Sequence, residues 1–245
     1  MGYYNYQNGL IYNHLSQKGG WDSHFEHCRN FIMRALDLYK PQKVTILGSG
    51  WLLELSLAEM IEKTKKVCLV DIVHPPDVMD QAGSLKNVEL IEQDITGGLI
   101  EDVWQETGKY SFFKKLRSLE NISIPEYSQE GDPGLIFSLN ILTQLESLLI
   151  DFIKERSKIR EEEFTGFRAE IQKKHIDFLK KHESVLITDL SEIITDNSGR
   201  VTEEITMLTD LPAGKYREEW IWNFDYARSD FHTKRSVFKI VGIVM

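Results

Sequence analysis

Short, mostly apolar runs that alternate with segments of helical periodicity constrain the fold more than any other feature of this sequence. The runs cover residues 43–47, 67–71, 88–94, 134–140 and 185–190. Strands that lack polar alternation are buried on both faces, which is typical of parallel sheets with helices on either side. The first two runs lie about 20 residues apart, a length that fits one right-handed βαβ crossover. The sequence therefore predicts an α/β fold, a doubly wound three-layer sandwich.

The segment before the first strand is predicted to form an N-terminal helical extension over residues 1–40. Its first part is aromatic and polar, with turn signals at Asn8-Gly9 and Gly19-Gly20. A helix then begins near Trp21 and ends before Pro41. Its apolar face is predicted to consist of Phe25, Cys28, Phe31, Ile32, Ala35 and Leu38.

Residues 41–245 are predicted to form one decorated domain, because the motifs run through the whole chain and leave no second core. A second helix is expected directly after Gly50, and another over Ile141–Ile153. Helical insertions are expected near residues 99–133 and 155–182. Two alternating segments in the tail, 219–224 and 236–245, predict a C-terminal antiparallel hairpin.

Charge and cysteine content narrow the set of partners and the compartment. The formal net charge is −9, from 29 basic and 38 acidic residues, and an anionic surface disfavours nucleic acid as a partner. No run reaches the roughly 18 apolar residues that span a bilayer, and the N-terminus lacks a secretory pattern. We therefore expect a cytoplasmic protein with no membrane contact, in which Cys28 and Cys68 are reduced core thiols.

Glycines and acids stand at the carboxyl ends of the predicted strands. In an open α/β sheet, ligands bind beyond these ends, at the point where the strand order reverses. Gly48-Ser49-Gly50 permits a sharp turn and a close approach of a ligand to the backbone. Asp71 lies 21 residues after Gly50 and is placed to accept hydrogen bonds from a ribose diol, and Asp94 from an adenine amino group. This pattern predicts a site for a dinucleotide or for S-adenosylmethionine (SAM).

Four motifs carry this pattern: VTILGSG at 44–50, LVDI at 69–72, EQDI at 92–95 and IFSLNILTQL at 136–145. Their order and spacing resemble the class I SAM-dependent methyltransferases, over residues 21–245. The resemblance implies a Rossmann-like domain whose seven-stranded, mostly parallel sheet closes with an antiparallel C-terminal hairpin. It also implies SAM as the cofactor and methyl transfer as the activity.

The resemblance implies one role in cofactor binding for each motif. The glycine loop passes close to the methionine part of SAM, the acid after the second strand holds the ribose, and the third and fourth motifs contact the adenine and the sulfonium. The implied residues are Gly48, Ser49 and Gly50 for the methionine part, Asp71 for the ribose, Ile72, Asp94 and Ile95 for the adenine, and Asn140 beside the sulfonium.

Two positions depart from the family pattern and keep two alternatives open. An acid is usual where Ile46 stands and a third glycine where Leu52 stands, and Glu54 is a candidate substitute carboxylate. These departures support the alternative of a non-catalytic Rossmann-like protein that binds a nucleoside or a protein partner. An NAD(P)-dependent oxidoreductase shares the two glycines, but it requires a third glycine at Leu53 and gives no reason for Asp94.

The acceptor of the methyl group is predicted to be a small molecule. The fourth strand ends in Leu139-Asn140-Ile141-Leu142 and lacks the Asn/Asp-Pro-Pro-aromatic signature that is associated with methylation of bases or glutamine. Methyl transfer depends mainly on positioning, so no catalytic residue is assigned. The candidate substrate contacts are Trp21, Trp51 and Trp222, with core packing as the alternative for Trp222. The oligomeric state is left open.

Three further features each have two interpretations. His24 and His27 have the spacing of a metal site on one helix face, but packing or solvated histidines are expected and no metal is predicted. Asp189 either caps a loop at the end of its strand or contacts substrate. The N-terminal aromatic residues either form a lid over cofactor and acceptor or pack across the sheet edge; they are Tyr3, Tyr4, Tyr6, Tyr12 and Trp21.

Overall fold

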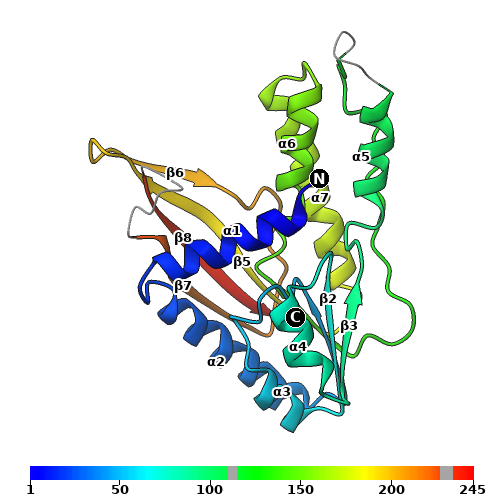
Figure 1. Ribbon diagram of the computed structural model, residues 1–245, viewed down its shortest axis with the longest axis vertical. Helices are drawn as coiled ribbons and strands as arrows, with labels where there is room; N and C mark the ends of the chain where they lie inside the picture. The colour runs from blue at the N-terminus through cyan, green and yellow to red at the C-terminus, as the bar shows by residue number, and fades with distance from the viewer. Residues whose placement is uncertain (110–114, 227–233) are drawn as a thin grey trace.

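The central element of the fold is a sheet with helices on both faces, seen in a computed structural model that describes residues 1–109, 115–226 and 234–245 (Figure 1). The helices are α1 (Tyr3–Ser16), α2 (Asp22–Tyr39), α3 (Leu57–Lys63), α4 (Pro76–Gly83), α5 (Leu99–Gly108), α6 (Ser147–Arg156) and α7 (Glu161–Leu179). The strands are β1 (Lys43–Leu47), β2 (Lys66–Asp71), β3 (Val88–Glu92), β4 (Leu135–Leu139), β5 (Ser184–Thr195), β6 (Val201–Ile205), β7 (Tyr216–Asp225) and β8 (Arg235–Val244).

The strands follow the order β3-β2-β1-β4-β5-β8-β7 along one sheet. The pairs from β3 to β5 are parallel, whereas β8 runs antiparallel between β5 and β7. β6 lies outside this path and pairs antiparallel with the last part of β5. The predicted α/β sandwich, with a mostly parallel sheet and an antiparallel C-terminal hairpin, is therefore confirmed, and β6 is an addition to it.

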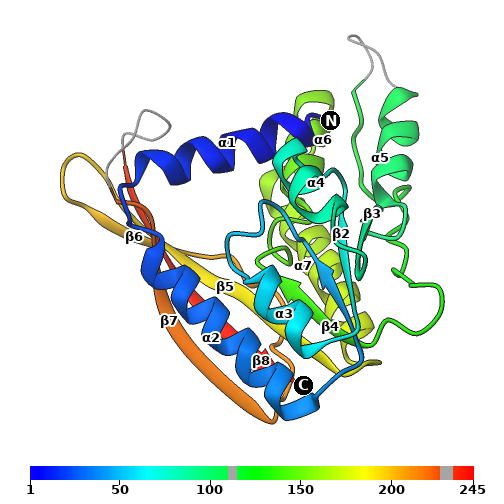
Figure 2. The same ribbon diagram turned by 60° about the horizontal axis from the view of Figure 1, so that its bottom comes forward.

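Helices cover both faces of the sheet (Figure 2), and each face has its own apolar core. α2, α3 and α4 pack on one face, and α5, α6 and α7 pack on the other. Phe31 of α2 is fully buried against β8, where an added Cβ on Gly242 would lie 2.8 Å from the Cζ of Phe31. Glycine at this position lets α2 pack closely on the sheet, and each buried side chain of this size stabilises the fold by about 1.5–3 kcal/mol.

The helix predicted before Pro41 is confirmed as α2, with one correction to its buried face. Leu38 is 59% exposed, and Leu36 is buried in its place. Leu36 lies one helical turn after Ile32, whereas Leu38 points to the solvent side of the helix. Among the described residues, no helix has the length and apolarity that crossing a membrane requires.

Three further segments differ from the sequence prediction. α1 continues through Asn8-Gly9, where the sequence predicts a turn. The second helix begins at Leu57 and not directly after Gly50, because Leu52 adopts a positive φ of 59°, which an α-helix does not permit. The helix predicted from Ile141 begins only at Ser147, after a series of turns.

The predicted insertions contain regular helices. α5 lies in the segment 99–133 and α7 in the segment 155–182, while residues 110–114 of the first insertion and residues 227–233 between the hairpin strands lie outside the described residues. The division at residue 40 stays a prediction, and α2 of the proposed extension packs on the sheet with α3 and α4.

α1 lies across the carboxyl ends of the strands, as its orientation in Figure 2 shows. The indole nitrogen of Trp51, in the loop after β1, donates a hydrogen bond of 2.9 Å to the carbonyl of Gln7. At the other end of the helix, Gln17 donates a bond of 3.1 Å to Asp225, the last residue of β7. These contacts hold α1 over the edge of the sheet at which ligands bind in open α/β folds.

Candidate functional site

The strand order reverses between β1 and β4, and both strands are followed by residues with a left-handed backbone. Gly48 after β1 has φ of 76°, and Asn140 after β4 has φ of 48°. A Cβ on Gly48 would lie 2.8 Å from the Cβ of Ile141 and 3.0 Å from the carbonyl oxygen of Leu139. Glycine therefore lets the two strand ends approach each other at the reversal point, where such sheets bind ligands.

Asp71 ends β2 and is only 5% exposed. Its Oδ2 accepts a hydrogen bond of 2.8 Å from the Gly50 N–H, and its Oδ1 accepts one of 2.8 Å from the Ile72 N–H. Gln7 of α1 approaches Oδ1 at 3.5 Å. Burial raises the pKa of Asp71, while its backbone hydrogen bonds and His74 act in the opposite direction. The carboxylate thus connects the glycine loop, β2 and α1.

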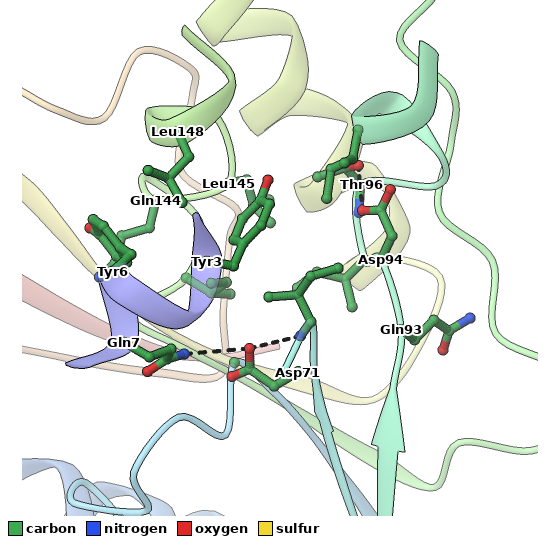
Figure 3. Close-up of a pocket in the computed structure, with 15 residues that line it drawn as sticks. Tyr3, Tyr6, Gln7, Asp71, Gln93, Asp94, Thr96, Gln144, Leu145 and Leu148 are labelled. Atoms are coloured by element: carbon green, nitrogen blue, oxygen red, sulfur yellow. Dashed lines mark hydrogen bonds between the residues drawn. The ribbon is translucent and has the colours of Figure 1, made fainter. Parts of the chain in front are cut away.

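One pocket lies between α1 and the ends of β2 and β3, and we name it the Asp94 pocket (Figure 3). Asp94 Oδ1 accepts hydrogen bonds from the Thr96 N–H at 2.8 Å and from its hydroxyl at 2.5 Å, which fixes the carboxylate. The pocket is lined by Tyr3, Tyr6, Gln7, Gly48, Asp71, Ile72, Gln93, Asp94, Ile95, Thr96, Ile100, Ile141, Gln144, Leu145 and Leu148.

A second pocket lies on the other side of Asp71, and we name it the Asn140 pocket. Asn140 Nδ2 lies 3.5 Å from Glu54 Oε1, and burial raises the pKa of the Glu54 carboxyl. The loop that carries Glu54 turns at Leu52, the position of the missing glycine. The pocket is lined by Gln7, Leu10, Trp21, Gly48, Gly50, Trp51, Leu53, Glu54, Asp71, Leu139, Asn140, Ile141, Gln144 and Trp222.

The structure brings most of the predicted site residues to these two pockets. Gly48 and Asp71 line both of them, while Ser49 lines neither, and its buried hydroxyl has no partner among the described residues. Ile72, Asp94 and Ile95 line the Asp94 pocket, and Gly50, Asn140, Trp21, Trp51 and Trp222 line the Asn140 pocket.

Asp189 does not end its strand, so its interpretation as a loop cap is wrong. β5 continues to Thr195, and its pairing with β8 shifts register between Asp189 and Ser191. Such bulges re-aim side chains and are frequent beside functional sites. The Thr143 hydroxyl donates a hydrogen bond to Asp189 Oδ1.

α1 contributes side chains whose positions the sequence does not specify. Tyr3, Tyr6 and Gln7 of α1 line the Asp94 pocket, and Figure 3 shows Gln7 directed at Asp71, so these side chains lie at the pocket and not across the sheet edge. Gln144 lines both pockets and carries no sequence signal, because it follows Asn140 in an irregular turn. Residues 3–16 give no signal of a covering helix either, because α1 has no apolar stripe.

His24 is a buried structural residue of α2. Trp220 Nε1 donates a hydrogen bond of 3.0 Å to His24 Nδ1, and Asn140 Nδ2 lies 3.1 Å from His24 Nε2. Burial lowers the pKa of His24 to about 3, so the ring is neutral at physiological pH. His27 is exposed and contacts the carbonyl of Ser23. The described part of the chain holds no group of three or more His, Cys, Asp or Glu side chains that could bind a metal ion.

Comparisons with known proteins give only distant similarities. No protein-family model and no curated protein sequence matches the chain. Among solved structures, it is similar to the N-methyltransferase NodS from Bradyrhizobium japonicum WM9 in complex with S-adenosyl-L-homocysteine (SAH), with 11% identity, a TM-score of 0.39, and coverage of 88% of this chain and 85% of that one.

A structure of the DhpI–SAH complex is also similar, with 9% identity, a TM-score of 0.34, and coverage of 98% of this chain and 94% of that one. A third is a precorrin 8w decarboxylase from Methanobacterium thermoautotrophicum, with 12% identity, a TM-score of 0.27, and coverage of 86% and 87%. At these scores and identities, the similarities are too low to assign a family or an activity.

Proposed function

We propose that the chain binds SAM and transfers its methyl group to a small-molecule acceptor. The observation that carries the proposal is the convergence of Asp71 and Asp94, from the ends of neighbouring strands, on a pocket that begins at Gly48. An acid at each of two adjacent strand ends is what an adenosine ligand needs, because one accepts from the ribose diol and the other from the adenine amino group.

Polar atoms without partners support the presence of a ligand in these pockets. The Tyr3 hydroxyl, Gln7 Oε1 and Asn140 Oδ1 are buried and have no hydrogen-bond partner within residues 1–109, 115–226 and 234–245. Buried polar groups are nearly always hydrogen-bonded in folded proteins. All three of these side chains line the Asp94 pocket or the Asn140 pocket, so a polar ligand that extends through both would satisfy them.

The site residues then take the roles that the resemblance implies. Glu54 lies beside Asn140 and Gly50, which supports its role as the carboxylate for the ammonium group of the methionine part, in place of the acid that is absent at Ile46. The remaining assignments are Asp71 for the ribose, Ile72, Asp94 and Ile95 for the adenine, Gly48, Ser49 and Gly50 for the loop along the methionine part, and Asn140 for the floor beside the sulfonium.

When bound, SAM supplies a methyl group on a sulfonium, which a lone pair of the acceptor attacks in line with the breaking bond. The chain itself has to position the acceptor and exclude water. α1 covers the pockets with Tyr3, Tyr6 and Gln7, and Trp51 anchors this helix through the Gln7 carbonyl. These contacts support a role for α1 as the lid, and the need for a base depends on the acceptor.

The sheet order favours this proposal over an NAD(P)-dependent oxidoreductase. Dinucleotide-binding folds of the usual kind have six parallel strands in the order 3-2-1-4-5-6. Here the antiparallel β8 separates β5 from β7, as expected from the resemblance to methyltransferases. The non-catalytic alternative was supported by two departures, the missing acid at Ile46 and the missing glycine at Leu52. Leu52 adopts the left-handed backbone that a glycine favours, so the loop makes this turn without glycine.

Isothermal titration calorimetry of the full chain with SAM, SAH, NAD⁺ and NADH tests the proposal. We expect SAM and SAH to bind with one-to-one stoichiometry and the dinucleotides to bind far more weakly. Binding of NADH with no binding of SAM or SAH at millimolar concentration would favour the oxidoreductase. A protein that binds SAH but releases none from SAM with any acceptor pool would support the non-catalytic alternative.

A further inference from the structure

A third pocket borders the proposed cofactor site on the side of β5, β7 and β8, and we name it the Asp189 pocket. It shares Tyr6 with the Asp94 pocket and Trp222 with the Asn140 pocket, and Gln144 lines all three. The three pockets therefore meet beneath α1. A molecule in the Asp189 pocket would lie next to the proposed cofactor, which is where a methyl acceptor has to bind.

Aromatic rings form one wall of the Asp189 pocket. Trp222 and Phe224 of β7 lie with ring centroids 5.0 Å apart at 90°, and Phe224 and Phe238 of β8 lie 5.1 Å apart at 81°. This edge-to-face arrangement is rigid and apolar. Ring faces of this kind attract organic cations, because the π-face carries partial negative charge.

Asp189 is the carboxylate on which the chemistry of this pocket depends, among the described residues that line it. Asp189 and Glu192 line it from β5, and Arg168 of α7 is the only cation among the described residues that do so. Arg168 Nε donates a hydrogen bond of 3.2 Å to Glu146, which is fully buried. Arg168 is thus held by Glu146, and no described cation forms an ion pair with Asp189, whose carboxylate is available to a bound molecule.

Tyr6 of α1 lines the same pocket from the opposite side. The pKa of Tyr6 is raised to about 12, first by burial and then by Asp189, Asp151 and Glu146. Asp189 itself is 8% exposed, and its Oδ1 accepts the hydrogen bond from Thr143. The pocket thus presents a fixed, nearly buried carboxylate beside the aromatic wall.

One indole N–H of the wall has no hydrogen-bond partner among the described residues. Trp222 is 5% exposed, and its Nε1 makes no hydrogen bond in the part of the chain that the structure describes. A buried indole N–H usually finds an acceptor. Trp222 lines both the Asp189 pocket and the Asn140 pocket, so an acceptor atom of a bound molecule would satisfy this group.

We propose that the Asp189 pocket is the methyl-acceptor site and that its substrate is a small organic amine with an apolar or aromatic body. This inference rests on the proposed function. Asp189 attracts the ammonium form, and the rings of Trp222, Phe224 and Phe238 pack against the body. A carboxylate or phosphate acceptor would instead be repelled by the Asp189 carboxylate.

The protons and electron pairs of this methyl transfer are accounted for by the amine, Asp189 and SAM. One proton of the ammonium passes to Asp189 and from there to water, which leaves a neutral amine with a free lone pair. That lone pair forms the N–C bond to the methyl carbon as the S–C bond breaks, and the electron pair of the S–C bond stays on sulfur. The products are the protonated N-methyl amine and SAH.

Benzyltrimethylammonium is a suitable probe, because it is a permanent cation that cannot be methylated. We would measure its affinity by calorimetry, with and without saturating SAH, beside benzyl alcohol as the neutral probe and phenylacetate as the anion. The cation is expected to bind at least about tenfold more tightly than either other probe, in line with a desolvated cation–π site that also carries a carboxylate. Equal affinity for the three probes would overturn the proposal.

Asp189→Asn keeps an oxygen for the Thr143 hydroxyl and removes the charge, and Asp80→Asn removes an exposed charge from α4 as the matched control. We expect Asp189→Asn to weaken cation binding about tenfold without changing SAH affinity, and Asp80→Asn to change neither. Phe238→Leu is a second variant in case Asp189→Asn unfolds, with an expected loss of about threefold.

The outcomes separate the two proposals. SAH binding with no preference for the cation, or a cation affinity that is unchanged in both pocket variants, overturns the amine acceptor and leaves the proposed function standing. A chain that does not bind SAH overturns the proposed function, and with it the role of this pocket in methyl transfer.

Discussion

Replacement of Gly48 by alanine is expected to destabilise the fold far more than the same change at Gly50, although both glycines have a positive φ. At Gly48, the new Cβ would lie 2.8 Å from the Cβ of Ile141 and 3.0 Å from a backbone oxygen, whereas carbon atoms in contact lie at about 3.5–4.0 Å. At Gly50, the nearest atom is Gln7 Oε1 at 3.9 Å. The two variants therefore share the backbone penalty and differ in packing.

The expected losses of stability follow from the backbone penalty and from the packing overlap. A left-handed backbone costs a residue with a Cβ about 1–2 kcal/mol, and forced overlap in a packed region costs about 1–3 kcal/mol. We expect Gly48→Ala to lower the free energy of unfolding by about 2–5 kcal/mol and Gly50→Ala by about 1–2 kcal/mol. Urea denaturation followed by circular dichroism measures both values.

Gly166 in α7 provides a control for the method, because nothing lies within 4 Å of its Cβ position and its φ is ordinary. Gly166→Ala should stabilise the protein by about 0.5–1 kcal/mol, since alanine favours a helix interior. A Gly48→Ala variant within 0.5 kcal/mol of Gly50→Ala would refute the claim that β1 and β4 meet closely at the reversal point.

Two further changes probe the neighbourhood of the site. Burial raises the pKa of Glu146 to about 7, so its contribution to stability is present below its ordinary pKa and is lost as the pH rises through 7. Urea denaturation at several pH values measures the free energy of unfolding of the wild type and of Glu146→Gln. Between pH 5 and 8 this free energy should shift by about 2–3 kcal/mol in favour of the variant. A difference between the two proteins that stays constant with pH would contradict the raised pKa. Trp51→Phe removes the hydrogen bond to the Gln7 carbonyl and should speed amide exchange in α1 about fivefold, for a bond of about 1 kcal/mol. Unchanged exchange would show that other contacts hold this helix.

The sequence specifies the sheet because each core strand has its own local signal. Residues 43–47 contain the β-branched run Val44-Thr45-Ile46, and the structure has β1 over the same residues. Asp71 ends β2 and Asp94 lies two residues after the end of β3, so their meeting at one sheet edge follows from the parallel pairing of these strands. Strand β6 could not be found in this way, because all five of its residues are exposed and no apolar alternation marks it.

The position of α1 over the site depends on tertiary contacts that no local sequence pattern encodes. α1 buries Asn13 alone, so it lacks the apolar stripe by which a surface helix is recognised. Its position comes from single hydrogen bonds, such as those of Trp51 and Gln17 to distant partners. Leu52 is a second example, since a leucine in left-handed conformation is held by its surroundings and not by its own preference.

The central claim is that Asp71 binds the ribose of an adenosine cofactor, and calorimetry of SAH binding to Asp71 variants tests it most directly. Asp71→Ala should weaken SAH binding by about 1–3 kcal/mol, the range for a buried hydrogen bond to a charged group. Asp71→Asn, which preserves the shape of the side chain, serves to check that the loss comes from the carboxylate and not from a disordered glycine loop.

Asp80→Ala, on the exposed side of α4, is the matched control and should leave the affinity unchanged. The account predicts tight SAH binding by the wild type and by the control, with weaker binding by both Asp71 variants. SAH affinity that is the same in all four proteins would contradict it.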